Sequence, residues 1–343
     1  MKRITVLLPA YNEEASLPLL HDKMVKTASE NPGYEWEFLI VDDGSTDATA
    51  SIAAGFHESD SRFSYIALSR NFGKEAAMLA GMDYATGHAV IIMDSDMQHP
   101  TDVIPRMLEL WEEGWQDVYA QRTESNEGWW KRKTSQWYYK LLQNVTRVPI
   151  QPDTGDFRLL DRVCVNALRQ MRETQRNTKG MYCWIGYRKK GIQYKQLNRT
   201  SGRSKWNFFS LINLAIEGLT SYTTAPLRIA SLLGVLCSLI GFVYLVYVLV
   251  NTLIWGDPVA GYPTLMVTIL FLGGVQLLCL GIIDEYLSRV FNESKHRQPY
   301  IVNVYNGTQV MPDVHTSTHE KAAQYPLYHG SGHVSFQGWG VCA

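Results

Sequence analysis

Two long uncharged segments near the C-terminal end limit what this chain can fold into. Residues 229–256 and 258–283 contain no Asp, Glu, Lys or Arg. Roughly 20 apolar residues are enough to cross the hydrocarbon core of a bilayer, and each segment exceeds that length. Two buried helices of a soluble domain are the alternative, but such helices rarely stay uncharged for so long. The two segments therefore predict a helical hairpin in a membrane.

The distribution of basic residues predicts the orientation of this hairpin. The linking segment "WGDPVAGYP" contains no Lys or Arg, whereas Arg228 precedes the hairpin and Arg289, Lys295 and Arg297 follow it. Because Lys and Arg are enriched in cytoplasmic loops, we expect the link outside and both flanks inside. The part of the chain before the hairpin and both ends of the chain would then be cytoplasmic.

Short apolar runs alternate with helical patterns in the first third of the chain. The runs "ITVLLPA", "EFLIVDDGSTD", "FSYIALSRNFG" and "AVIIMDSDMQ" predict strands, and residues 13–30, 47–59 and 74–86 between them show helical spacing. This alternation predicts an α/β fold with a parallel sheet covered on both faces. Ligands bind outside the carboxyl ends of such strands, where the polar residues follow here. No GxGxxG follows the first strand and no GxxxxGK[ST] occurs, which argues against dinucleotide-binding and P-loop folds.

Composition excludes several other classes of function. The net charge of −1 over 343 residues provides no global field that would attract nucleic acid. The five cysteines are scattered without a CxxC pair, which argues against a disulfide framework or a structural zinc site and fits a reducing compartment.

The segment "IIMDSDMQHP" predicts a divalent cation site. Asp94 and Asp96 follow a buried run, and neighbouring carboxylates there are costly unless a cation compensates them. Because side chains alternate along a strand, both can approach one ion while Ser95 points away. With the amide oxygen of Gln98 as a third ligand, the set suits Mg²⁺ or Mn²⁺.

The segment "DDGSTD" places two more carboxylates at a strand end. Gly44 suits the turn, and the residues after it suit the cap of a helix. Asp42 and Asp43 are not needed for such a cap, so we assign them to the base or ribose of a nucleotide. Lys74 in "NFGKEAA" can reach a phosphate, or it is an ordinary solvated lysine.

Three further segments have less specific patterns. Residues 127–145 and 206–228 are aromatic and predict helices in the membrane interface, with ordinary amphipathic core helices as the alternative. From residue 308 the chain is polar and rich in His, Gly and Ser, which predicts a flexible tail. The pairs His315/His319 and His329/His333 have a metal-binding spacing if helical, but glycines argue against a helix at the second pair. We therefore divide the chain into residues 1–205, 206–227, 228–291 and 292–343, the last flexible after about 306.

Six segments in order give the chain a family resemblance. "LLPAYNEE", "VDDGSTD", "SRNFGKEAAMLAG", "MDSDMQHP", "TGDFRLLDR" and "RTSGRSKW" together resemble family 2 glycosyltransferases of the polyprenyl-phosphate branch, such as bactoprenol glucosyltransferases and dolichol-phosphate mannose synthase. The resemblance implies a Rossmann-like GT-A domain followed by interfacial helices and a two-helix transmembrane hairpin. It implies an inverting single displacement from a UDP-sugar to undecaprenyl phosphate, with Mg²⁺ or Mn²⁺, in the bacterial inner membrane. A homotetramer is also implied, and no nucleic-acid partner is expected.

The resemblance also assigns roles to residues of this chain. Asp156 lies beside the reacting centre as a base or a positioning group, and Arg122 lies in a loop near the diphosphate. Asp96 is expected to be catalytic as well as to bind the metal. The acceptor phosphate is bound by Arg203, Ser204 and Lys205. The residues expected to bind the nucleotide sugar are Pro9, Tyr11, Asn12, Glu13, Asp42, Asp43, Lys74, Asp94 and Ser95, and those expected to bind the metal are Asp94, Asp96 and Gln98.

Two other functions remain open from the sequence. A membrane glycosyltransferase that extends a polysaccharide would normally carry a QxxRW motif and more membrane helices. A non-catalytic scaffold that senses sugar nucleotides would be expected to lose Asp94 or Asp96, and both are present. The sequence does not name the sugar; glucose is the first choice, with N-acetylglucosamine, mannose and an aminoarabinose derivative as alternatives.

Overall fold

The computed structural model describes residues 1–122, 154–174, 176–194, 225–255 and 261–310. The helices and strands below all lie in Met1–Gln309, which forms one compact unit. The strands are β1 (Lys2–Ala10), β2 (Tyr34–Asp42), β3 (Phe63–Leu68), β4 (Ala89–Ile92), β5 (Asp117–Arg122), β6 (Thr154–Asp161), β7 (Lys189–Tyr194), β8 (Val302–Tyr305) and β9 (Thr308–Gln309). The helices are α1 (Leu17–Glu30), α2 (Thr49–Ser59), α3 (Lys74–Tyr84), η1 (Thr101–Val103), α4 (Ile104–Glu112), α6 (Arg162–Gln170), α7 (Thr178–Trp184), α9 (Ala225–Trp255) and α10 (Tyr262–Ser294).

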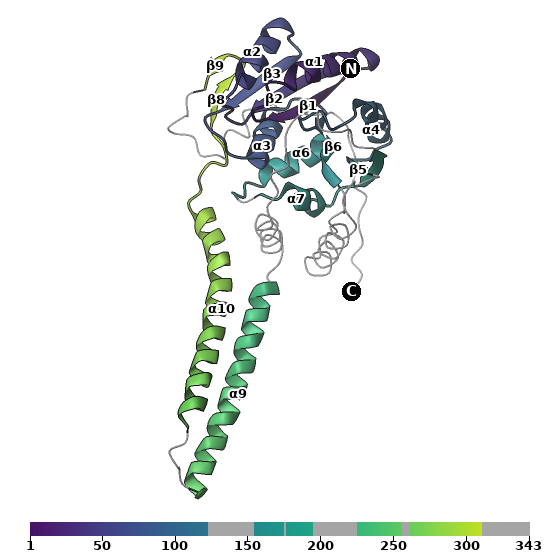
Figure 1. Ribbon diagram of the computed structural model, residues 1–343. Helices are drawn as coiled ribbons and strands as arrows, with labels where there is room; N and C mark the ends of the chain where they lie inside the picture. Colours follow the sequence, from purple (N-terminus) through teal and green to yellow (C-terminus); the bar gives the residue numbers. More distant parts are fainter. Residues whose placement is uncertain (123–153, 175, 195–224, 256–260, 311–343) are drawn as a thin grey trace. The chain divides into compact units, whose positions relative to one another are not determined.

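The first four strands form the parallel centre of the sheet, as the sequence predicts. The full order among the described strands is β7-β5-β6-β4-β1-β2-β3-β8-β9 (Figure 1). Strand β1 pairs in parallel with both β2 and β4, so that Ile4 lies opposite Trp36 on one side and Ala89 on the other. The carboxyl ends of β1, β2 and β4 therefore meet at one edge of the sheet, where the predicted site residues follow.

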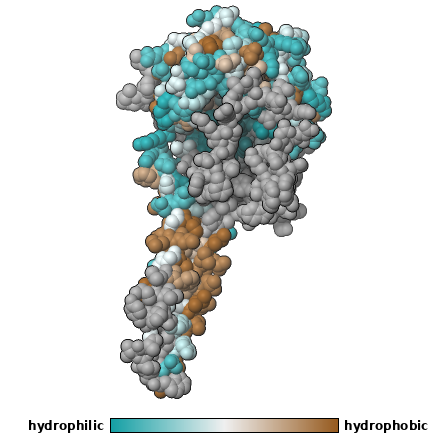
Figure 2. All heavy atoms as spheres, in the orientation of Figure 1, coloured by the Kyte–Doolittle hydropathy of each residue, from teal (hydrophilic) through white to brown (hydrophobic). Residues whose placement is uncertain are grey.

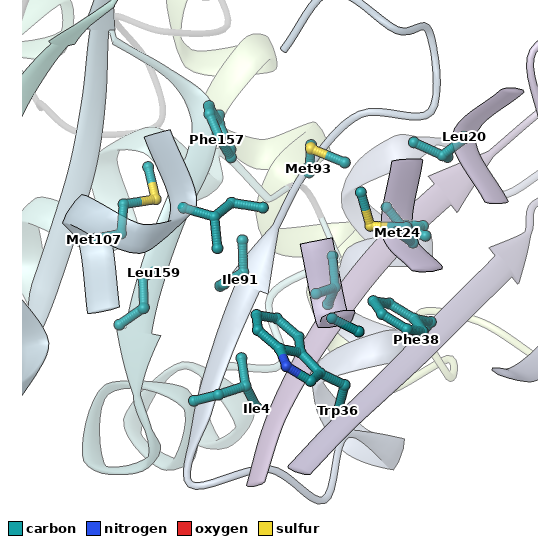
Figure 3. Close-up of a cluster of buried hydrophobic side chains, with 14 of the residues drawn as sticks. Ile4, Leu20, Met24, Trp36, Phe38, Ile91, Met93, Met107, Phe157 and Leu159 are labelled. Atoms are coloured by element: carbon teal, nitrogen blue, oxygen red, sulfur yellow. The ribbon is translucent and has the colours of Figure 1, made fainter. Parts of the chain in front are cut away.

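Both faces of this central part are covered. Ile4, Val6 and Leu8 of β1 belong to a buried cluster that includes Met24 of α1 and Met107 of α4 (Figure 3). The alternate residue Leu7 points to the other face, where α3 packs closely. A Cβ atom on Gly81 of α3 would lie only 1.9 Å from Cδ1 of Leu7. Burial on both faces explains why these strands are almost continuously apolar.

The sheet as a whole is mixed, which corrects the prediction of a parallel sheet. Strand β6 runs antiparallel to both β4 and β5, and β8 runs antiparallel to β3. The parallel prediction rested on strands that alternate with helices, and that rule applies to β1–β4 only. Beyond them, the chain reaches β6 and β8 after long intervening segments, so no local pattern sets the strand direction.

A buried ion pair joins two of these additional strands. Nη1 of Arg158 on β6 lies 3.1 Å from Oδ2 of Asp117 on β5, and both side chains are almost fully buried. The guanidinium carbon of Arg158 also lies 3.6 Å from the ring centre of Tyr182 on α7. An unpaired charge at this depth would be strongly destabilising, so the pair favours this pairing of β5 with β6.

The segment after α10 returns to the sheet. Strand β8 pairs with β3, and Oδ1 of Asn306 accepts a hydrogen bond from the backbone N–H of Tyr65 at 2.8 Å. The sequence pattern predicted a separate C-terminal region here and no strand. Residues up to Gln309 thus complete the sheet that begins at Lys2.

Helices α9 and α10 are long and apolar enough to cross a membrane. Their best candidate spans are Leu227–Tyr244 and Phe271–Ser294, of which 6% and 0% of the residues are buried. Figure 2 shows hydrophobic side chains on the surface of the described parts of both helices. The helices pack against each other, with the thiol of Cys279 contacting the carbonyl of Ala230 at 3.5 Å. Apolar surface on this scale fits contact with lipid and indicates membrane association.

Candidate active site

The loop after β1 is fastened to the loop after β2. Asn12 has a φ of 55°, and its backbone N–H donates to Oγ of Ser45 at 2.9 Å. Its side-chain oxygen accepts a hydrogen bond from the backbone N–H of Thr46, also at 2.9 Å. The backbone N–H of Glu13 donates to Oγ1 of Thr49 at 2.8 Å. Residues predicted to bind the nucleotide therefore also hold these two loops together.

Tyr11 and Pro9 lie on either side of the end of β1. The side chain of Tyr11 is exposed and is available to stack on a base. The carbonyl of Pro9 accepts a hydrogen bond from the buried hydroxyl of Ser95 at 2.8 Å. The hydroxyl of Ser95 is thus turned toward the end of β1, although β4 ends at Ile92 and Ser95 lies beyond the strand.

The carboxylates of Asp42 and Asp43 accept hydrogen bonds from backbone N–H groups. These contacts were not predicted from the sequence. The two carboxylate oxygens of Asp43 accept hydrogen bonds from the backbone N–H groups of Phe72 and Gly73, at 2.8 and 2.9 Å. Oδ1 of Asp42 accepts one from the backbone N–H of Ser45 at 3.2 Å. Burial raises the pKa of both carboxyls. Asp43 therefore fixes the loop that leads into α3, and contact of either aspartate with a nucleotide stays a prediction.

Three predicted site residues meet at the centre of the site. Nζ of Lys74 lies 2.6 Å from Oδ1 of Asp94 and 2.6 Å from Oδ2 of Asp156. Lys74 is the first residue of α3, Asp94 follows the end of β4, and Asp156 lies near the start of β6. The structure thus joins the predicted metal-binding aspartate to the residue expected beside the reacting centre.

The ion pairs at this centre favour the charged forms of Lys74 and Asp94. Burial opposes the charge on Lys74, but Asp156 and Asp94 outweigh burial and raise its pKa. Burial also opposes ionisation of Asp94, but a hydrogen bond with His99 and the charge of Lys74 hold its pKa well below the usual range. Asp94 is therefore a carboxylate at neutral pH.

The side chain of His99 contacts the carboxylate of Asp94. This contact was not predicted from the sequence. Its Nε2 lies 3.6 Å from Oδ2 of Asp94, and its Nδ1 lies 3.3 Å from the hydroxyl of Tyr194. The ring is buried and packs against Phe157 at 4.8 Å between ring centres. The only signal in the sequence is its place in "MDSDMQHP", because its partner on β7 is far away in the chain.

Asp96 and Gln98 belong to the turn that follows β4. Oδ1 of Asp96 accepts a hydrogen bond from the backbone N–H of Gln98 at 3.1 Å. Between them Met97 has a φ of 64°, in the left-handed region. This turn holds the carboxylate of Asp96 and the amide of Gln98 close in the chain, at the same strand end as Asp94.

The donor set fits a hard divalent cation. In the part of the chain that the structure describes, no three His, Cys, Asp or Glu side chains form a ready metal cluster. However, Oδ1 of Asp156 is buried without a hydrogen-bond partner, and Oδ1 of Asp94 has an ion pair with Lys74 but no hydrogen bond of good geometry. Such oxygens require a cation or a donor, and carboxylate and amide oxygens are what Mg²⁺ and Mn²⁺ prefer.

Arg122 lies at the end of β5, close to this group. It donates a hydrogen bond to Tyr194. Burial raises the pKa of Tyr194, although this hydrogen bond lowers it in part. A Cβ atom on Gly155 would lie 3.7 Å from Nη2 of Arg122, so the guanidinium is next to the residue that precedes Asp156. Arg203, Ser204 and Lys205 lie outside the described residues, as do the aromatic segments at 127–145 and 206–224.

The half-buried Glu75 follows Lys74, and its role was not predicted from the sequence. Oε2 of Glu75 accepts a hydrogen bond from the backbone N–H of Thr178 at 3.2 Å. Burial and the charge of Asp156 raise the pKa of Glu75 to about 7. Nε and Nη2 of Arg176 are buried without a hydrogen-bond partner, and the Arg176 charge lowers the pKa of Glu75 in part.

Comparisons with known proteins find similar sequences and similar structures. A family model described as "Glycosyl transferase family 2" matches residues 5–169, and one described as "GtrB C-terminal hairpin" matches residues 225–290. The bactoprenol glucosyl transferase of Shigella phage SfV is 42% identical over 88% of this chain and 98% of its own length. A prophage bactoprenol glucosyl transferase homolog of Escherichia coli (strain K12) is 40% identical over 88% and 98%. The crystal structure of mannosyl-3-phosphoglycerate synthase from Rubrobacter xylanophilus is similar over 63% of this chain and 71% of that one, with 17% identity and a TM-score of 0.44.

Proposed function

Because the chain belongs to glycosyl transferase family 2 and carries the GtrB C-terminal hairpin, we propose that it transfers glucose from UDP-glucose to undecaprenyl or another polyprenyl phosphate. That it is a glycosyltransferase of the GT-A class follows from the family, as its motifs predicted. The named relatives are bactoprenol glucosyl transferases, which supports the glucose and the lipid acceptor.

The observation that carries the proposal is the contact of Asp94 and Asp156 with one ammonium group at the carboxyl end of the sheet. Asp94 is a carboxylate poised for a cation, and Asp156 approaches the same point from β6. This shared contact supports assigning cation binding to Asp94 and a position beside the reacting centre to Asp156.

The reaction needs little acid–base chemistry. A phosphate monoester is largely dianionic at neutral pH and is itself the nucleophile. One of its oxygens forms a bond to the anomeric carbon while the bond from that carbon to the diphosphate oxygen breaks, which inverts the configuration. The electron pair leaves on the diphosphate, and no proton needs to be removed. We therefore assign Asp156 to orienting the sugar or a cationic acceptor-binding group, not to general-base catalysis.

The principal barrier is repulsion between two anionic reactants. We propose that Asp94, Asp96 and Gln98 hold Mg²⁺ or Mn²⁺, which when bound neutralises charge on the leaving diphosphate. Lys74 and Arg122 add cationic groups from the protein on the same side. Arg203 and Lys205 are proposed to bind the acceptor phosphate, with Ser204 between them.

The acceptor determines where the enzyme works. A polyprenyl chain is confined to a bilayer, and α9 and α10 have the length and apolar surface to span one. We propose the bacterial inner membrane, with the catalytic residues and both ends of the chain on the cytoplasmic side and a homotetrameric assembly.

The experiment that tests the proposal uses purified full-length protein with a panel of labelled sugar nucleotides and undecaprenyl phosphate in detergent. UDP-glucose should give a lipid-extractable product, and Arg203→Ala with Lys205→Ala should remove transfer while UDP-glucose binding stays near normal. Transfer from another sugar alone would correct the donor. No transfer from any of them would refute the function.

A further inference from the structure

The side chain of Lys74 is partly exposed and contacts the carboxylates of Asp94 and Asp156. Its ammonium is 2.6 Å from an oxygen of Asp94 and 2.6 Å from an oxygen of Asp156. Yet its side chain remains 42% exposed, compared with 28% for Asp94 and 10% for Asp156. The ammonium can therefore leave the pair toward solvent or toward a ligand without moving through the protein.

The backbone that leads into Lys74 is fixed, so that movement of its charge depends on its side chain. Gly73, the residue before it, has a φ of 96°. The backbone N–H groups of Phe72 and Gly73 are both held by the carboxylate of Asp43. A lysine carries a compact charge on a flexible four-carbon stem. Rotation about that stem is enough to move the charge between neighbouring anions.

We propose that Lys74 is a resident counter-ion of Asp94 and Asp156, which gives way to the divalent cation and then binds the donor diphosphate. The inference deepens the proposed function and rests on it. Before the donor arrives, Lys74 keeps two close carboxylates from repelling each other. When the nucleotide sugar and its cation bind, the ammonium exchanges a carboxylate oxygen for a phosphate oxygen.

The physical basis is competition between two cations for one oxygen. An ammonium and a divalent ion that both contact Oδ1 of Asp94 would be close enough to repel each other strongly. Lys74 therefore weakens binding of the cation when it comes alone. The diphosphate brings negative charge that the same ammonium can satisfy, so Lys74 strengthens binding of the nucleotide. Lys74 therefore lowers the affinity for the cation alone and raises the affinity for the nucleotide.

Simpler roles for Lys74 predict other changes in the two binding affinities when Lys74 is removed. If Lys74 only binds phosphate, its removal weakens nucleotide binding and leaves binding of the cation alone unchanged. If it only stabilises the local fold, its removal weakens both. Tighter binding of the cation in the absence of nucleotide is expected from the counter-ion role alone.

The test measures binding of Mn²⁺ to the full-length protein in neutral detergent at pH 8, by the loss of the free-ion paramagnetic resonance signal. Lys74→Met should bind Mn²⁺ alone about tenfold more tightly than the wild type, since one competing charge is gone. With saturating Mn²⁺, the same variant should bind UDP about tenfold more weakly, as expected for one lost charged hydrogen bond. Lys74→Arg, which keeps the charge, should stay near the wild type for Mn²⁺.

A matched control removes a lysine elsewhere. Lys26→Met, which breaks the exposed pair of Lys26 with Glu30 on α1, should leave both affinities unchanged. Unaltered or weaker Mn²⁺ binding by folded Lys74→Met would overturn the inference, and Lys74→Gln provides a second variant if the first does not fold. Because neither assay uses glycosyl transfer, this failure is distinct from a failure of the proposed function.

Discussion

The hydroxyl of Tyr300 donates a hydrogen bond to the carboxylate of Asp83 at 2.5 Å, although 217 positions separate the two residues in the chain. Asp83 lies near the end of α3, and Arg172 and Arg169 also donate to it. Tyr300 follows α10. The segment that leaves the hairpin is therefore tied to the helix whose first residue is Lys74.

We predict that Tyr300→Phe lowers the thermal unfolding midpoint of the detergent-solubilised protein. The variant loses one hydrogen bond to a buried charge, which is worth about 1.5–3 kcal/mol. The exposed hydroxyl of Tyr247 on α9 provides the control, and Tyr247→Phe should leave the midpoint unchanged. Equal midpoints for the two variants would show that the Asp83 contact does not hold the segment.

Gly44 should be irreplaceable in the turn after β2. Its φ is 67°, and an added Cβ atom would lie 2.3 Å from the backbone carbon of Arg70 and 2.6 Å from the backbone N of Asn71. We expect Gly44→Ala to destabilise the protein by at least about 2 kcal/mol, from left-handed strain together with a backbone clash. Gly114 also has a positive φ, of 92°, but open space around it. In chemical denaturation Gly114→Ala should cost clearly less, and a cost as large as that of Gly44→Ala would contradict the clash.

Glu75 should make stability depend on pH. Its pKa rises from the ordinary 4.5 to about 7 in the folded protein, so folding favours the protonated carboxyl. This contribution is complete below pH 4.5 and is lost as the pH rises through 7. Glu75→Gln removes the dependence and should be more stable than the wild type at pH 8, by up to about 3 kcal/mol.

Thermal unfolding at a series of pH values checks this prediction. The difference between Glu75→Gln and the wild type should grow from pH 5 to pH 8 in the same detergent. The exposed Glu113 offers a control, because Glu113→Gln should show no such growth. A difference that does not change with pH would contradict the raised pKa.

The proposed topology can be tested in intact cells. The chain has five cysteines, which would first be replaced by alanine or serine. Val259→Cys in the link between the two long helices should react with a membrane-impermeant thiol reagent. Ser59→Cys, exposed on α2, should react only after lysis. Labelling of Ser59→Cys in intact cells would reverse the orientation.

The sequence predicted the centre of the fold well because that part follows local rules. Strands β1 to β4 alternate with helices, and their polar residues come directly after the apolar runs. The polar segment after β4 was located correctly, but β4 ends at Ile92, so Asp94, Ser95 and Asp96 follow the strand instead of alternating along it. The convergence of Lys74 on Asp94 follows from the same strand ends.

What the sequence could not predict depends on contacts between distant segments. The directions of β6 and β8 are set by partners that lie far away in the chain. His99 supports Asp94 only because β7 brings Tyr194 beside it. The structural role of Asp43 requires the loop at Phe72 and Gly73 to approach β2. Residues of this kind show no spacing that marks them.

We propose that the residues at the carboxyl end of this sheet transfer glucose to a lipid phosphate. The most direct measurement is the transfer of labelled glucose from UDP-glucose to undecaprenyl phosphate by purified protein, followed by extraction of the lipid. The wild type should form labelled lipid, excess EDTA should stop it, and added Mn²⁺ should restore it. Asp94→Asn and Asp96→Asn should each lower the rate at least about a hundredfold, because each acts on the cation that stabilises the leaving group, while the thermal midpoint stays near that of the wild type. Full transfer in EDTA, or near-normal transfer by Asp94→Asn, would contradict the account.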